Sequence, residues 1–218
     1  MATQTEENYL KALYYLSSGT EEVSVSALSA FLEVSKPTAN SMVKNLKEQG
    51  LLIYEKYKPL LLTEEGRKAA ALILRKHRLT EMYLVEKMGF GWDEVHEIAE
   101  QVEHIKSPAF FDRMDELMNY PKVDPHGSPI PDKEGNITQR SYKGLNQCKP
   151  GDEVTLSALS HSSKEFLAFL DSKGLRLGSN LKIESIASFD GSVTVRYDDH
   201  QESLSAQVSE RLLVEVIT

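Results

Sequence analysis

A helix that stops and restarts within a few residues is the feature that most restricts how this chain can fold. Apolar side chains recur at helical spacing at Val25, Leu28, Phe31 and Leu32, and the sequence EVSKP then interrupts them. Ser35 is a favourable N-cap, and Pro37 suits the first turn of a new helix. The buried face of that second helix is predicted to comprise Ala39, Met42, Val43 and Leu46, with its end at Gly50. Two short helices joined by so tight a turn predict a helix-turn-helix.

The next residues extend this motif into a winged helix. LLIYEK and LLLTEEG indicate two strands on either side of Tyr57-Lys58-Pro59, which would form the tip of the wing. The exposed face of the second helix and this tip carry side chains that can bond to phosphates and base edges. The predicted DNA-binding residues are Ser35, Lys36, Pro37, Thr38, Asn40, Ser41, Lys44, Lys47, Lys56, Tyr57 and Lys58. The alternative is a winged helix used for protein contacts.

The charge of the chain is unevenly distributed. A net charge of −8 argues against a non-specific nucleic-acid binder. However, residues 35–58 hold five lysines and two acids, whereas residues 77–126 hold eleven acids and five Lys or Arg. One basic segment beside a strongly acidic one suggests two separate tasks, and binding of DNA through five lysines would weaken steeply with salt.

The acidic segment contains HEIAEQVEH, in which metal-ligating side chains recur at helical spacing. His96, Glu100, Glu103 and His104 would share one stripe of a helix. Imidazole and carboxylate groups on one stripe suit a divalent first-row metal, although a solvated acidic face would show the same pattern. A hydrolytic site is disfavoured because HEIAE lacks the second histidine of HExxH. We therefore expect no enzyme.

The C-terminal part changes period. KIESIASF and SVTVRYDD alternate like strands around an Asp190-Gly191 turn, and KEFLAFLDSKGL indicates one helix ended by Gly174. This predicts a small, mostly β barrel with one helix. Cys148 is the single cysteine, so an internal disulfide and a CxxC zinc site are excluded. No apolar run approaches 18 residues and no signal peptide is evident, so we expect a cytoplasmic protein without a membrane partner.

Three segments of the chain carry a resemblance to a known family: EENYLKALYYL, SKPTANSMVKNLKEQGLLIYEKYKPLLLTEEG and LRKHRLTEMYLVEKMGFGWDEVHEIAEQVEH. They resemble the diphtheria-toxin-repressor and manganese-transport-regulator family of metal-dependent bacterial repressors. The resemblance implies a mainly α fold with small β parts. Its expected parts are a winged helix-turn-helix (1–74), a helical metal-binding and dimerisation domain (75–125), a Pro/Gly linker (126–144) and an SH3-like, FeoA-type β-barrel (145–218). It also implies a homodimer that binds a palindromic operator in double-stranded DNA, with no small-molecule substrate.

The resemblance also implies metal ligands. Asn8, Glu100, Glu103 and His104 match the primary site, and His77, Glu81 and His96 match the ancillary site. His161 is a candidate further ancillary ligand. At position 100 iron-responsive members have cysteine and manganese-responsive members have glutamate, whereas at position 8 they have methionine and aspartate, so Asn8 departs from both patterns. Lys11 replaces a glutamate of the paired metal site in some two-domain manganese regulators, which argues against that arrangement here.

The expected cofactors are Mn(II) or Fe(II), at two sites per subunit, with Mn(II) favoured because the ligand set contains no sulfur. Zn(II) or Co(II) could also bind in vitro. The hypothesis is that metal ties the first helix to the dimer core and sets the spacing of two recognition helices. Without metal, the carboxylates would repel one another. The alternative function is a non-catalytic metal-binding adaptor whose winged helix contacts proteins.

Overall fold

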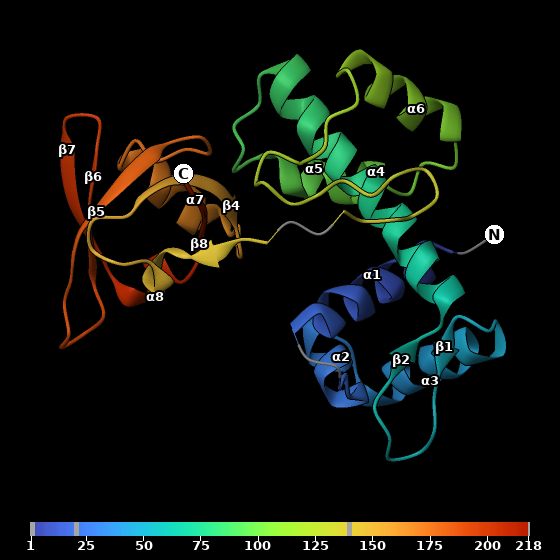
Figure 1. Ribbon diagram of the computed structural model, residues 1–218. Helices are drawn as coiled ribbons and strands as arrows, with labels where there is room; N and C mark the ends of the chain where they lie inside the picture. Colours follow the sequence, from blue (N-terminus) through green and yellow to red (C-terminus); the bar gives the residue numbers. More distant parts are fainter. Residues whose placement is uncertain (1–2, 20–21, 139–140, 218) are drawn as a thin grey trace. The chain divides into compact units, whose positions relative to one another are not determined.

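The computed structural model describes residues 3–19, 22–138 and 141–217 (Figure 1). The chain forms two compact units, and each unit combines several chain segments. The first comprises Met1–Thr80, Ala99–Leu117 and Ile130–Thr138, and the second comprises Glu81–Ile98, Met118–Pro129 and Gln139–Thr218.

The N-terminal part is a winged helix. Its elements are α1 (Gln4–Gly19), α2 (Val25–Phe31), α3 (Lys36–Glu48), β1 (Leu52–Ile53) and β2 (Leu61–Leu62). The hydroxyl of Ser35 accepts a hydrogen bond from the Thr38 amide, and proline stands in the first turn of α3, as local capping rules predict. The two wing strands are only two residues long, shorter than the predicted runs, and an isolated bridge between Val23 and Leu60 extends the pairing.

The core of the winged helix lies between the faces of its helices. Leu28, Val43 and Leu46 are fully buried there. The predicted apolar stripe is wrong at Phe31, which is 52% exposed, since α2 ends at this residue and turns its side chain outward. Burial therefore follows a narrower stripe than the apolar pattern predicts.

Three helices follow the wing. They are α4 (Glu64–Met88), α5 (Val95–Val102) and α6 (Pro108–Leu117). The prediction of one helix through His104 is wrong by two residues, because Glu103 and His104 follow α5 in a turn. The Glu103 amide still donates to the carbonyl of Ala99 at 2.9 Å. The hydrogen-bond pattern of the helix therefore continues as far as Glu103.

The segment after α6 contains two turns with the same hydrogen bonds. In residues 124–128 and 132–136, the first aspartate accepts backbone N–H bonds from the second and fourth residues that follow it. A linker over 126–144 stays a prediction, and its residues 139–140 lie outside the described part of the chain. The first turn is buried at Asp124 and His126, whereas Asp132 is exposed.

The C-terminal part is a six-stranded antiparallel sheet in the order β3-β8-β4-β5-β6-β7. Its strands are β3 (Lys143–Gly144), β4 (Glu153–Leu159), β5 (Asn180–Ile186), β6 (Val193–Tyr197), β7 (His200–Leu204) and β8 (Leu212–Val216). The short helices are η1 (Leu145–Gln147), α7 (Lys164–Ser172) and α8 (Ala206–Ser209). The predicted hairpin around Asp190-Gly191 joins β5 to β6, and the predicted helix is α7.

These elements confirm the predicted fold class of a mainly helical chain with a β-rich C-terminal part. The sheet and α7 enclose their own apolar core, to which Leu156, Leu170 and Ile183 contribute fully buried side chains. Among the described residues, no helix combines the length and the hydropathy that crossing a membrane requires.

Candidate metal centres

The first centre lies where α1 meets the end of α5. We call it the Glu103 centre; its residues are Glu7, Asn8, Lys11, His77, Glu100, Glu103 and His104. Three of them come from α1 and one from α4, while Glu100 lies on α5 and the last two follow it. All lie within the first compact unit. Folding thus brings together four of the predicted ligands, which are His77, Glu100, Glu103 and His104. Asn8 lies on α1 between Glu7 and Lys11, which contact them.

His104 is oriented by a carboxylate from α1. Its Nδ1 lies 2.6 Å from Oε2 of Glu7, while its Nε2 is buried and lacks a hydrogen-bond partner. A carboxylate that accepts the Nδ1 proton fixes the tautomer in which Nε2 offers a lone pair. Glu103 Oε1 lies 3.7 Å from that nitrogen. His104 is therefore prepared to ligate a metal ion through Nε2.

Asn8 supplies a second donor atom without a partner. In the described part of the chain, four buried side-chain polar atoms lack a hydrogen bond: Asn8 Oδ1, Tyr9 Oη, His104 Nε2 and Tyr142 Oη. Buried polar atoms in proteins are nearly always paired. Two of these four belong to predicted ligands, so the residues present fit a bound cation.

The negative charge of the Glu103 carboxylate is balanced by neighbouring side chains. It is fully buried, and Lys11 Nζ lies 2.7 and 2.9 Å from its two oxygens and 2.6 Å from Oε1 of Glu100. His77 Nδ1 lies 2.6 Å from Glu103 Oε2. Burial alone would raise the pKa of Glu103, but the His77 hydrogen bond and the Lys11 charge outweigh it and hold that pKa below its ordinary value. The hypothesis of mutually repelling carboxylates is thus wrong for this pair.

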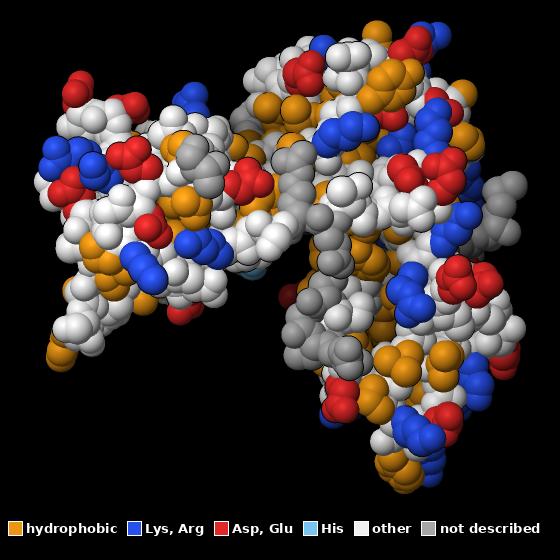
Figure 2. All heavy atoms as spheres, viewed as in Figure 1, with side chains coloured by type: hydrophobic (Ala, Val, Ile, Leu, Met, Phe, Trp, Pro, Cys, Tyr) orange, Lys and Arg blue, Asp and Glu red, His pale blue; other side chains and the backbone are white. Residues whose placement is uncertain are grey.

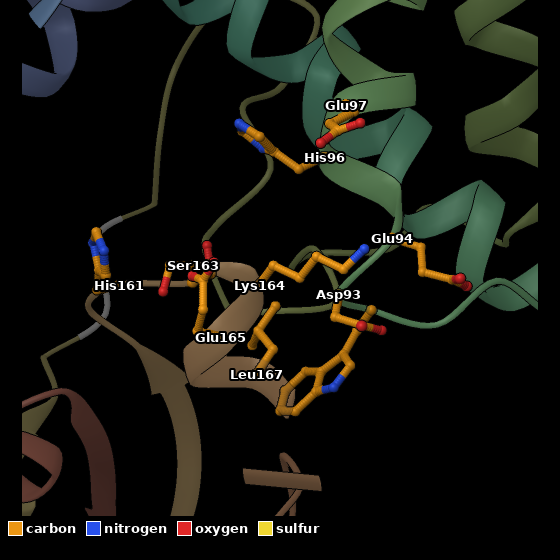
Figure 3. Close-up of a pocket in the computed structure, with 11 residues that line it drawn as sticks. Asp93, Glu94, His96, Glu97, His161, Ser163, Lys164, Glu165 and Leu167 are labelled. Carbon is orange, nitrogen blue, oxygen red and sulfur yellow. The ribbon is translucent and has the colours of Figure 1, made fainter. Parts of the chain in front are cut away.

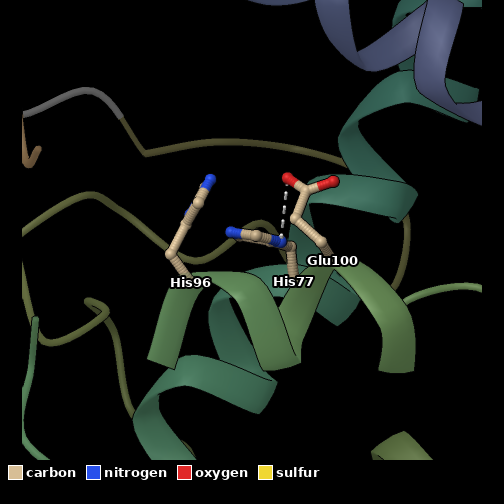
Figure 4. Close-up of side chains that lie close together, drawn as sticks. All are labelled: His77, His96 and Glu100. Carbon is tan, nitrogen blue, oxygen red and sulfur yellow. Dashed lines mark ion pairs between the residues drawn. The ribbon is translucent and has the colours of Figure 1, made fainter. Parts of the chain in front are cut away.

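His77, which was predicted for the ancillary site, therefore faces Glu103 and Glu100, two residues predicted for the primary site. Its Nδ1 lies 3.9 Å from Oε1 of Glu100, the ion pair dashed in Figure 4. His96 precedes Glu100 by one turn on α5, so α5 presents both side chains on one face. Glu81 stands one turn beyond His77 on α4. Two histidine–glutamate pairs with a spacing of four residues thus lie on these helices, His77 and Glu81 on α4, and His96 and Glu100 on α5.

A second centre forms around Glu81. We call it the Glu81 centre; its residues are Glu81, His96, Asp124 and His126, all in the second compact unit. Ligand atoms of Glu81, Asp124 and His126 lie within 4.8 Å of one another, and all three side chains are buried. His96 Nδ1 lies 3.2 Å from Glu81 Oε1, and His126 Nδ1 lies 3.8 Å from Oε2. Two carboxylates and two imidazoles suit a divalent first-row metal.

Sequence reasoning missed Asp124 and His126. They stand in a stretch rich in proline and glycine, at the boundary between the predicted helical domain (75–125) and the predicted linker (126–144). The backbone holds them in place, because the His126 carbonyl accepts a bond from the Leu159 amide of β4. Gly127 makes this approach possible: its φ is +85°, and a Cβ there would lie 2.3 Å from the Ser157 carbonyl oxygen. The available signal was an acid and a histidine two residues apart beside that glycine.

His161 lines a different part of the second unit. A cavity of about 520 Å³ lies along the start of α7 and the residues before α5, and His96 and His161 both line it. Figure 3 shows the two histidines among acidic and hydroxyl side chains, with Lys164 reaching across from α7. His161 is exposed. Its role as an ancillary ligand stays a prediction.

The predicted DNA-binding residues form an exposed face. On α3 and its cap these are Ser35, Lys36, Pro37, Thr38, Ser41, Lys44 and Lys47, whereas Asn40 is half-buried and accepts a bond from the Tyr54 hydroxyl. At the wing, Tyr57 is 92% exposed and Lys56 Nζ lies 4.9 Å from its ring centroid. Around the loop between β1 and β2, Figure 2 shows Lys or Arg side chains beside hydrophobic ones. This surface could meet an acidic polymer.

Three family models match consecutive parts of the chain. The N-terminal DNA-binding domain of iron-dependent repressors matches residues 1–60, and their metal-binding and dimerisation domain matches 63–132. The FeoA domain matches 143–216. The HTH-type transcriptional regulator MntR of Oceanobacillus iheyensis is 32% identical over 124 residues, which cover 57% of this chain and 84% of that protein. This chain belongs to the iron-dependent repressor family.

Further members of the family resemble the chain over different lengths. The iron-dependent repressor IdeR of Mycobacterium bovis is 39% identical over 131 residues, which cover 58% of this chain. The match spans 55% of IdeR, so the chain corresponds to about half the length of that relative. A solved manganese-dependent transcriptional repressor in complex with manganese has a TM-score of 0.87 at 31% identity, covering 97% of this chain and all of that one.

Proposed function

We propose that the protein is a metal-dependent transcriptional repressor that binds a palindromic operator as a homodimer when loaded with Mn(II) or Fe(II). Family membership supports this proposal, as do relatives described as iron-dependent and as manganese-dependent repressors. The proposal assigns the centres a sensing role and no reaction. Because its target is DNA, the protein would act in the cytoplasm.

The two unpartnered atoms of the Glu103 centre carry this proposal. Asn8 Oδ1 comes from α1 and His104 Nε2 from the turn after α5, so an ion held by both joins these two elements. Glu103 and Glu100 supply the negative charge. The second ion would be held by Glu81, Asp124 and His126, with His96 beside them. Donors of nitrogen and oxygen without sulfur favour Mn(II), and Fe(II) is also accepted.

Helix α1 links the Glu103 centre to the recognition helix. Glu6 Oε1 accepts hydrogen bonds from the side-chain amides of Asn45, at 2.8 Å, and Gln49, both at the C-terminal end of α3. A bound divalent ion supplies positive charge that attracts ligands from α1 and α5 together. Residues of α1 then hold α3 in one orientation before DNA arrives, which lowers the ordering cost of binding.

The test is the affinity for DNA with and without metal. Fluorescence anisotropy of a promoter fragment would be recorded under anaerobic conditions with Mn(II), Fe(II), Zn(II) or a chelator. Asn8→Leu keeps the approximate shape of the side chain and removes the donor oxygen. We expect it to weaken metal-stimulated binding at least tenfold (about 1.4 kcal/mol) without lowering the melting temperature in chelator, because it removes an unsatisfied buried polar atom.

Asn136→Leu is the matched control, since Asn136 is exposed and bonds to Asp132 in the second turn. It should leave metal-stimulated binding unchanged. Equally tight binding of the unaltered protein in chelator and in metal would refute the proposal. Absence of binding to every operator-like fragment, with metal and in chelator, would instead favour the adaptor alternative.

A further inference from the structure

Trp92 is the single tryptophan of the chain, and it lies in the turn between α4 and α5. Glu81 on α4 and His96 on α5, two residues of the Glu81 centre, precede and follow this turn. The side chain of Trp92 is half-buried and packs against the apolar core of the C-terminal sheet. The proposed function assigns no task to this residue. Its contacts with the Glu81 centre and with α7 indicate one.

The backbone carbonyl of Trp92 faces the imidazole of His126. His126 Nε2 lies 2.9 Å from that carbonyl oxygen, and the residue is 4% exposed. A carbonyl oxygen only accepts hydrogen bonds, so Nε2 carries the proton of the neutral ring. Nδ1 then keeps its lone pair, and it lies 3.8 Å from Oε2 of Glu81. His126 is thus held in the tautomer that offers Nδ1 to a metal ion.

The indole of Trp92 anchors the backbone that carries this carbonyl. It stacks on the imidazole of His126, with the ring centroids 6.1 Å apart and the ring planes 19° apart. Its Nε1–H donates a hydrogen bond of 2.9 Å to Oδ2 of Asp171 on α7. Helix α7 in turn contributes Leu167 and Leu170 to the core of the C-terminal sheet. One side chain therefore connects an imidazole of the Glu81 centre with α7.

The two centres present opposite nitrogens of their histidines. At the Glu103 centre, His104 faces the Glu7 carboxylate through Nδ1 and leaves Nε2 for a metal ion. At the Glu81 centre, His126 donates from Nε2 to a neutral carbonyl and leaves Nδ1. The partner of one ring nitrogen decides which nitrogen can ligate. Because the partner of His126 is a backbone atom, its position depends on the Trp92 side chain that anchors the turn.

We propose that Trp92 is the positioning residue of the Glu81 centre, where it holds His126 ready to ligate through Nδ1 and connects that ligand to α7. This inference rests on the proposed function, because it assumes that the centre takes metal. An imidazole that is already oriented loses less freedom when an ion binds. A movement of this ring on binding would reach α7 through the stacked indole and its hydrogen bond to Asp171.

The first test determines the tautomers in the full-length chain without metal. Proton–nitrogen NMR spectra in chelator, at a mildly alkaline pH where imidazoles are neutral, distinguish protonated from unprotonated ring nitrogens. We expect His126 to carry its proton on Nε2 and His104 to carry it on Nδ1. Trp92→Ala should give His126 a mixture of both tautomers and leave His104 unchanged. Trp92→Phe keeps a ring to stack and should retain more of the Nε2–H form.

Two results would overturn the proposal. The first is a proton on Nδ1 of His126 in the unaltered protein. The second is an unchanged His126 tautomer in Trp92→Ala, which would show that the indole does not set the position of the carbonyl.

Asp171→Ala keeps the test decisive if Trp92→Ala does not fold, because Asp171 is exposed. It removes the acceptor of the indole N–H. Mn(II) would be titrated while the fluorescence of Trp92 is recorded. We expect a weaker affinity, by less than the ~10–100-fold that typically follows loss of a direct partner of a ligand. Asp199→Ala, at an exposed carboxylate between β6 and β7, is the control, and equal affinities of the two variants would refute the connection to α7.

Failure of the proposed function looks different. If neither centre takes metal, Mn(II) would leave the fluorescence of the unaltered protein unchanged, while the tautomer of His126 in chelator would still depend on Trp92. If both hold, Asp124→Ala should abolish the fluorescence change and Asn8→Leu should preserve it. A change that persists in Asp124→Ala and disappears in Asn8→Leu would overturn the proposal.

Discussion

The two acidic centres of this protein differ in the groups that the structure places against their carboxylates. At the Glu103 centre, an ammonium from α1 lies 2.7 Å from a carboxylate that is 92 residues away in sequence. At the Glu81 centre, imidazoles of His96 and His126 face Glu81, and a turn closed by backbone hydrogen bonds supplies Asp124. The first centre is held by side-chain charge and the second by backbone geometry.

This difference indicates which elements a metal ion bound at each centre would connect. An ion at the Glu103 centre joins α1 to the residues after α5, and α1 carries the winged helix with it. An ion at the Glu81 centre joins α4 to a turn whose His126 carbonyl bonds to β4 of the C-terminal sheet. The first centre should therefore govern DNA binding, and the second the attachment of the turn to that sheet.

The largest effect is expected from removing the carboxylate shared by Lys11 and His77. Glu103→Ala leaves the buried Lys11 ammonium paired with Glu100 but no longer with the fully buried Glu103, and breaking a buried ion pair typically costs about 3–5 kcal/mol of unfolding free energy. Urea unfolding in chelator would measure it, together with loss of metal-stimulated DNA binding. Glu153→Ala, at an exposed carboxylate of β4, is the control and should change neither quantity. A stability loss below about 1 kcal/mol would show that charge does not hold this centre together.

A smaller loss of stability is expected from the turn at residues 124–128, and it should exceed the loss at the turn of residues 132–136. Asp124→Ala leaves the buried amide of His126 without an acceptor, at about 1–3 kcal/mol, and removes the acceptor of the half-buried Ser128 amide as well. Asp132→Ala breaks the same bonds in an exposed turn, where water replaces them, so it should cost below about 1 kcal/mol. Thermal melting would compare the two variants. Asp124→Ala should also bind one Mn(II) fewer, and equal effects of both variants would refute a special role for the first turn.

The smallest effect is expected from changing the carboxylate that orients His104. Glu7→Gln removes the negative charge that accepts the Nδ1 proton, and loss of such a partner typically weakens metal binding about 10–100-fold. Titration with Mn(II) in an Asp124→Ala background would report the Glu103 centre alone. Glu94→Gln, at an exposed carboxylate before α5, is the control. Unchanged affinity in Glu7→Gln would mean that His104 does not ligate through Nε2.

Local signals made much of the fold predictable. Ser35 and Pro37 mark the start of α3 because capping and proline geometry depend only on neighbouring residues. The Asp190-Gly191 turn is predicted for the same reason, and it fixes the β5–β6 hairpin. The wing strands were predicted too long, since pairing is confined to Leu52–Ile53 and Leu61–Leu62 and the neighbouring Leu60 pairs with Val23 instead.

The centres were predictable only in part. His96, Glu100, Glu103 and His104 were found through spacing, since all four lie on or directly after one helix. Lys11 and Glu7 could not be assigned their partners, because those contacts join segments 89 or more residues apart. Asp124 and His126 were missed because a buried turn and a linker share the same proline- and glycine-rich composition.

Helix α4 gives the protein a mechanical property. It begins two residues after the end of β2 in the wing and carries His77 thirteen residues further along, a span of roughly 20 Å at ~1.5 Å per residue. A rigid rod of that length converts rotation at one end into displacement at the other. A tilt of about 5° at the level of His77 would move the start of the helix by ~1.7 Å. A small rotation of α4 at the level of His77 would thus displace the start of the helix, next to the wing, by more than about an ångström.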